Sequence, residues 1–156
     1  MELEEAINKR KSIRHYNGES VTQEEVAKLL WAASKVPSAG NIHPLKIVTV
    51  YDKDLKEKLC HAALDQRCVA EAYVDLVILV DYGMMIRKYH RRGIRYAQME
   101  AGHIGQNISL MALSLGLGCV MIGAFRDVDV KLALGIEVED PLYIIPVGRI
   151  DELQTS

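Results

Sequence analysis

Hydrophobic residues recur along the chain with two spacings, one typical of helices and one typical of strands. Behind Thr22 the apolar residues fall three or four positions apart, on one face of a helix; they are Val26, Leu29, Leu30, Ala33 and Val36. Thr22 and Glu25 have the spacing of a capping box that begins this helix, and Pro37 ends it. Residues 45–51 and 74–80 are rich in β-branched residues and predict strands. The second is apolar at nearly every position, which predicts a strand covered on both faces.

The rest of the chain divides into further helices, strands and connections. We expect a short helix at 2–11, one or two helices within 53–72, a long helix at 96–115, a helix at 128–134, strands at 118–123 and 142–147, a loop at 37–44 and a basic connection at 86–95. Apolar positions surround much of the long helix, so it should be buried on several sides. This order of elements predicts one domain over residues 1–156, with helices packed on a sheet.

Composition and charge exclude several classes of protein. Of 156 residues, 49% are hydrophobic, 26% are charged and only 6% are aromatic, and the formal net charge is −2. This balance is typical of a globular protein and argues against a general binder of nucleic acid or of membrane surfaces. Three cysteines without a C-x-x-C pair argue against a disulfide framework, and we expect buried thiols. The histidines lack metal-ligand spacing, so we predict no metal site. The charged N-terminus does not resemble a signal peptide, and the expected location is the cytoplasm.

Three short clusters carry candidate chemistry. Arg10, Lys11, Ser12 and Arg14 combine forked donors, a point charge and a hydroxyl, as a phosphate requires, although cations near a helix end can also be a solvated face. Residues 37–44 form a proline-framed loop of small and amide residues, or simply a turn. Residues 116–125 contain glycines on both sides of a short strand, where a flat ligand could approach the backbone closely. They do not match the dinucleotide fingerprint.

Taken in this order, the clusters resemble the nitroreductase family of FMN-dependent oxidoreductases. The resemblance runs from about residue 6 to residue 148 and rests on RKSIRHY at 10–16, PSAGNIHP at 37–44, Gln66 to Ala72, YAQMEAGHIGQNISLMALSLGLGCVMIGAF at 96–125 and LGIEVEDPLYIIPVG at 134–148. It implies an α+β fold with a mixed, mainly antiparallel central sheet flanked by helices. It also implies an intertwined homodimer, with two FMN sites in the interface that are each built from both subunits.

The resemblance also implies roles for particular residues. Arg10, Ser12 and Arg14, with Lys11 beside them, match the segment that binds the FMN phosphate and the pyrimidine edge. The loop that reaches the flavin from the second subunit is matched by Ser38, Ala39, Asn41 and His43. Gln66 falls where an amide often meets the flavin ring, and the strand end along the isoalloxazine is matched by Ile122, Gly123 and Ala124. Phe125 follows this strand end and is expected near the cofactor pocket.

The chain departs from the family pattern in places that leave alternatives open. The loop ends in His43-Pro44-Leu45 instead of Gln-Pro-Trp, so His43 could replace the glutamine as a donor. The usual C-terminal Lys/Arg pair is missing, and Arg149 either replaces it at the phosphate or is a surface residue. Glu100 is expected on the helix surface or in a polar interface contact. The cations of 83–95 fit a solvated connection, a nucleic-acid patch, or a contact to the NADPH phosphate or an acidic substrate.

These expectations combine into one functional hypothesis. The protein is expected to take hydride from NAD(P)H and to reduce a nitroaromatic, quinone or similar acceptor by a ping-pong mechanism. No side chain is needed as nucleophile or general base, since the cofactor supplies the chemistry. The alternatives are a specialised flavin reaction, such as dehalogenation or dehydrogenation, and an FMN-binding module without turnover.

Overall fold

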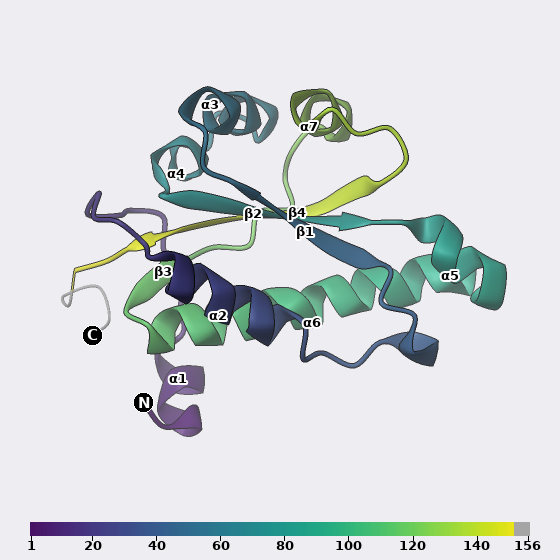
Figure 1. The fold of residues 1–156 in the computed structure, drawn as a ribbon, viewed down its shortest axis with the longest axis horizontal. Coiled ribbons are helices and arrows are strands. Elements are labelled where there is room, and N and C mark those ends of the chain that lie inside the picture. The colour runs from purple at the N-terminus through teal and green to yellow at the C-terminus, as the bar shows by residue number, and fades with distance from the viewer. Residues whose placement is uncertain (152–156) are drawn as a thin grey trace.

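A computed structural model describes residues 1–151 of the chain, and its centre is a four-stranded sheet between two layers of helices (Figure 1). The strands are β1 (Leu45–Val50), β2 (Val74–Val80), β3 (Leu117–Cys119) and β4 (Asp140–Arg149). Their order is β1-β2-β4-β3, and each neighbouring pair is antiparallel. The predicted α+β fold with a mainly antiparallel sheet is confirmed.

The helices cover both faces of the sheet. One face carries α2 (Gln23–Ala33) and the long α6 (Arg92–Ser114), whereas α3 (Lys53–Ala62), α4 (Arg67–Glu71) and α7 (Asp127–Leu134) cover the other (Figure 1). Leu76 and Ile78 of β2 belong to the core under α2 and α6, and Val77 and Leu79 belong to the core under α3, α4 and α7. All of β2 is buried, so the expectation of a strand covered on both faces is confirmed.

The capping box of α2 forms as the sequence predicts. The backbone N–H of Glu25 donates to the Thr22 hydroxyl at 3.1 Å, and the backbone N–H of Thr22 donates to the Glu25 carboxylate at 2.8 Å. Together these contacts satisfy two backbone donors at the helix start. The helix ends at Ala33, before Pro37.

The basic connection expected at 86–95 is wrong, because this stretch is largely helical. Helix α5 spans Tyr82–Tyr89, and α6 begins at Arg92. The side chain of Asp81 caps α5 by accepting from the backbone N–H of Gly83 at 2.9 Å. Gly93 lets the two helices pack closely, since a methyl group there would lie 2.7 Å from the backbone of Met85. The run of exposed cations obscured the helical pattern of α5 and of the first turn of α6, whereas the helix predicted at 96–115 is confirmed as the rest of α6.

Two other boundaries differ in ways that affect the candidate site. Helix α1 spans only Leu3–Lys9, so Arg10 and the residues after it lie outside the helix. The strand expected at 118–123 is shorter and earlier, since β3 ends at Cys119 and only a single bridge joins Ile122 to Ile144.

Candidate functional site

The cation-rich segment after α1, residues 10–16 and called the cation segment below, lies against the edge of the sheet. The backbone N–H of Ile13 donates to the carbonyl oxygen of Cys119 at 2.9 Å. The Tyr16 hydroxyl donates at 3.2 Å to the carbonyl oxygen of Pro146. Arg10 is half-buried and Arg14 is exposed, and neither forms an ion pair within residues 1–151. Two guanidiniums without carboxylate partners are therefore held on an ordered backbone, which suits an anionic ligand.

Two facing glycines let this segment approach the sheet. Gly118 of β3 pairs with Gly148 of β4. A methyl group at Gly118 would lie 2.6 Å from Cγ2 of Ile13, and one at Gly148 would lie 2.6 Å from Cγ of Tyr16. Both distances are far below carbon contact distance. The close approach expected of a flat ligand is therefore taken at Gly118 by the chain's own segment.

The strand end at 122–124 has an open glycine. Ile122 is buried and exchanges two backbone hydrogen bonds with Ile144, at 2.9 and 3.0 Å. Gly123 and Ala124 follow it and are exposed, and the nearest atom to a methyl group at Gly123 would be 3.8 Å away. Phe125 packs against the core on the α3, α4 and α7 side.

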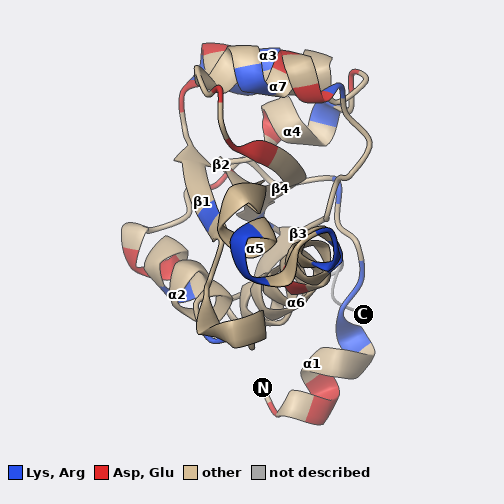
Figure 2. Ribbon diagram, turned by 90° about the vertical axis from the view of Figure 1, so that its right-hand side faces the viewer, with Lys and Arg blue, Asp and Glu red and all other residues tan. Residues whose placement is uncertain are grey.

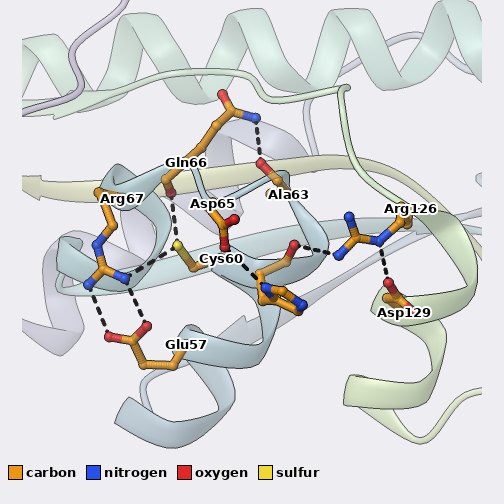
Figure 3. Close-up of polar contacts among 9 residues, drawn as sticks. Glu57, Cys60, Ala63, Asp65, Gln66, Arg67, Arg126 and Asp129 are labelled. Carbon is orange, nitrogen blue, oxygen red and sulfur yellow. Dashed lines mark hydrogen bonds and ion pairs between the residues drawn. The ribbon is translucent and has the colours of Figure 1, made fainter.

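Gln66 joins this strand end to the turn between α3 and α4. Its amide Nε2 donates to the carbonyl oxygens of Ala63 at 2.9 Å and Ala124 at 3.2 Å. Figure 3 shows the bond to Ala63 and the thiol of Cys60, which donates to the Gln66 carbonyl oxygen at 3.3 Å. Two predicted site residues, 58 positions apart, are thus in direct contact.

An ion pair and a hydrogen bond from a second guanidinium flank the Gln66 contact. Arg67 forms two hydrogen bonds of 3.0 Å to Glu57, and these lower the pKa of that carboxyl (Figure 3). Arg126, two residues after Ala124, donates to the carbonyl oxygen of His61 at 2.8 Å. These contacts hold the strand end against α3.

The loop at 37–44 is organised around Glu100 of α6. The Ser38 hydroxyl donates to the Glu100 carboxylate at 2.7 Å and accepts from the backbone N–H of His43 at 2.9 Å. The His43 ring contacts Oδ1 of Asn41 at 2.8 Å and lies 3.8 Å from Glu100. Ala39 is half-buried, whereas Asn41 and His43 are exposed.

Within one chain, this loop and the cation segment lie toward opposite ends of α6. Glu100 anchors the loop in the N-terminal half of the helix, whereas Arg10 and Ile13 line a small recess with Ser109 and Leu113. Nine residues of helix correspond to about 14 Å along its axis. Figure 1 accordingly shows α1 and the loop after α2 at different ends of the α6 layer.

Comparison with known proteins assigns the family. A profile of the nitroreductase family matches residues 7–71 and 60–149 of this chain. The chain belongs to the nitroreductase family. A provisionally named nitroreductase of Methanocaldococcus jannaschii is 36% identical, with 96% of this chain and 91% of that protein covered.

Two further relatives are longer than this chain. An FMN reductase [NAD(P)H] of Bacillus subtilis is 28% identical over 96% of this chain but only 64% of its own length. The structure of an NADPH:FMN oxidoreductase from Vibrio harveyi, in complex with NAD⁺, superimposes with a TM-score of 0.85 and 27% identity. It covers 95% of this chain and 68% of that one. This chain therefore spans about two thirds of the length of some of its relatives.

Arg149 faces the start of α2. Its guanidinium donates to the Glu25 carboxylate at 2.8 and 3.0 Å and to the carbonyl oxygen of Ser20 at 3.1 Å. Burial raises the pKa of Glu25, but the hydrogen bonds from Arg149 and Thr22 outweigh it and the net shift is downward. Arg149 is thus neither a free surface residue nor in contact with the segment at 10–14 among the interactions of residues 1–151.

The cations at the corner between α5 and α6 are all exposed, and Figure 2 shows blue ribbon at the α5 end of the molecule. They are Arg87, Lys88, Arg91, Arg92 and Arg95. A methyl group at Gly40 would lie 2.8 Å from Nζ of Lys88 and 2.6 Å from the Tyr89 hydroxyl, so this corner adjoins the 37–44 loop.

Glu100 is a functional candidate to which sequence reasoning gave no role in the site. It is buried, not on the helix surface as one reading had it. Its spacing from Ala97 and Ile104 places it on the apolar face of α6, which was the signal available in the sequence.

Other features of the described chain bear on the earlier expectations. All three cysteines are buried free thiols, as expected. Among residues 1–151, no group of three or more metal-ligating side chains is arranged to hold an ion. The helices of the same range include none with the length and apolarity needed to cross a bilayer.

Proposed function

We propose that this chain is an FMN-dependent NAD(P)H oxidoreductase that works as an intertwined homodimer, with residues 1–156 as a single FMN-binding domain in the cytoplasm. The observation that carries the proposal is the pair of guanidiniums at Arg10 and Arg14, which have no carboxylate partner in the described chain and are held beside the sheet. The names of the relatives, which include an FMN reductase and an NADPH:FMN oxidoreductase, support the flavin.

The proposed phosphate site consists of Arg10, Lys11, Ser12 and Arg14. The guanidiniums offer forked hydrogen bonds to phosphate oxygens, and Ser12 adds a neutral donor. Arg14 would also stabilise negative charge on the pyrimidine side of the flavin, which favours the reduced ring. Arg149 would need to leave Glu25 to reach the phosphate, so we propose that it contributes less to phosphate binding than Arg10 and Arg14.

The proposed ring site is the open strand end. Gly123 leaves room above the backbone, with Ile122 and Ala124 on either side of it. Gln66 already lies against Ala124 and presents its amide at this place. When bound, FMN would supply the hydride-transfer chemistry, so the chain's residues need only to bind and orient it.

The proposed contribution of the second subunit is the loop with Ser38, Ala39, Asn41 and His43. Within one chain this loop and the cation segment lie toward different ends of α6, which favours a site that combines the loop of one chain with the cation segment of another. This separation supports the homodimer. The proposed acceptor is a nitroaromatic, a quinone or a similar small molecule, and the two half-reactions would alternate at one flavin face.

Titration of the apoprotein with FMN tests the proposal. Arg10→Ala should weaken FMN binding by a factor of roughly 10–100, the effect of losing one or more hydrogen bonds between charged groups. Lys53→Ala, which removes an exposed cation from α3, is the control and should leave the Kd unchanged. Equal affinity of Arg10→Ala and the unmodified protein would remove Arg10 from the site.

A further inference from the structure

The conformation of the 37–44 loop needs support from outside the loop. Gly40, Asn41 and His43 have φ angles of 62°, 54° and 53°, all in the left-handed region. Residues other than glycine adopt this region at an energetic cost, and several of them persist together only where surrounding contacts fix the backbone. The structure must therefore contain an anchor for this loop.

Glu100 supplies that anchor. It is only 3% exposed, on the face of α6 that carries Ala97, Ala101 and Ile104. A carboxylate on an apolar helix face is costly unless hydrogen bonds satisfy it. Its polar contacts in the described chain are to Ser38 and His43, both of which belong to the loop. The carboxylate of Glu100 therefore joins α6 to the loop.

The contacts transmit the position of Glu100 to the exposed end of the loop. The Ser38 hydroxyl donates to Glu100 and accepts from the backbone N–H of His43, which fixes the two ends of the turn relative to each other. The His43 ring then meets the side chain of Asn41. Fixing one carboxylate therefore orients the two exposed polar side chains of the loop.

We infer that Glu100 is a positioning residue for flavin binding, and that it acts on the FMN site of the partner subunit through Ser38 and His43. The inference rests on the proposed function, because it requires the loop to reach a flavin. It assigns no contact between Glu100 and the cofactor. The ligand it affects is the FMN held by the cation segment of the other chain.

Hydrogen exchange of the FMN-free protein tests the anchor itself. Glu100→Ala removes the acceptor for Ser38, so the His43 amide should lose protection at least tenfold. Glu100→Gln keeps an acceptor oxygen at this place and should restore most of the protection. Glu24→Ala, which removes an exposed glutamate on α2, is the control and should leave the loop unchanged. Unchanged protection in Glu100→Ala would overturn the inference.

Flavin binding tests the action across the interface. In homodimers, Glu100→Ala should weaken the Kd for FMN roughly tenfold or more, the effect of one lost hydrogen bond to a charged group. A heterodimer of one Glu100→Ala chain and one Arg10→Ala chain has both defects in one site and an intact second site. It should therefore bind one FMN with the affinity of the unmodified protein.

The outcomes separate this inference from the proposed function. If Glu100 acted on its own chain's site, the heterodimer would have two damaged sites and no tight FMN, which would contradict the inference alone. If the unmodified protein bound no FMN, both proposals would fail. Should Glu100→Ala not fold, Glu100→Leu removes the acceptor for Ser38 while filling the same space, and it should give the same loss of affinity. Full affinity in that variant would overturn the inference.

Discussion

The close packing of Tyr16 on Gly148 allows a sharp test of how the cation segment is held. A methyl group at Gly148 would lie 2.6, 2.7 and 2.9 Å from three atoms of Tyr16, namely Cγ, Cδ1 and Cβ. Carbon atoms prefer separations of about 3.5–4.0 Å, so the tyrosine would have to move by about 1 Å. Its hydroxyl bonds to Ile13 and Pro146, both at 3.2 Å, lie on the same side chain and would be disturbed.

The expected magnitude follows from the cost of overpacking. Gly148→Ala should lower the free energy of unfolding by about 1–3 kcal/mol. For a chain of this size each kcal/mol corresponds to about 2–4 °C in Tm. Because Arg14 precedes Tyr16 by two residues, the same movement should displace its guanidinium and weaken FMN binding.

Thermal unfolding followed by circular dichroism, together with FMN titration, measures both effects. Gly135→Ala is the matched control, because Gly135 ends α7 with a φ of 66° and open space around it. This control should lose about 1–2 kcal/mol through backbone strain and keep its FMN affinity. If Gly148→Ala kept the Tm and the FMN affinity of the unmodified protein, the packing argument would be refuted.

Two further predictions concern the buried Asp75 and the partly buried Glu25. Burial raises the pKa of Asp75 well above its ordinary value, against the attraction of Lys56, so the unfolded chain loses this proton first as the pH rises. The free energy of unfolding should therefore fall by up to about 1.4 kcal/mol per pH unit above about pH 4. Urea titrations at several pH values should show that Asp75→Asn removes this fall. If the free energy of unfolding depended on pH in the same way in Asp75→Asn and in the unmodified protein, this reasoning would be contradicted. Arg149→Met should lower the free energy of unfolding by about 1–3 kcal/mol, and with it the Tm, because it leaves the partly buried Glu25 without its arginine partner. A loss of FMN affinity without a loss of Tm would instead assign Arg149 to the phosphate site.

Local sequence signals predicted much of the fold. The capping box at Thr22 and Glu25 depends on residues three positions apart, and it forms. The unbroken apolar run at 74–80 depends only on burial of both faces, and it is the central strand β2. Both signals are contained within one element, so no knowledge of the tertiary structure was needed to interpret them.

Contacts between distant segments were not predictable in the same way. Glu25 also accepts from Arg149, which is 124 positions away, and nothing local in the sequence marks this pair. The space at Gly118 was assigned to a ligand because its occupant, Ile13, comes from another part of the chain. Helix α5 and the first turn of α6 were missed because their exposed cations outweighed the single buried Met85 of α5, whereas the rest of α6 agrees with the helix predicted at 96–115.

Anaerobic addition of NADH and of NADPH to the FMN-loaded protein tests the central claim most directly. The account predicts that at least one donor bleaches the flavin absorbance at a rate that rises with donor concentration, and that a quinone or nitroaromatic then restores the colour. Bound flavin that stays yellow with both donors would contradict the assignment of this chain as an NAD(P)H oxidoreductase.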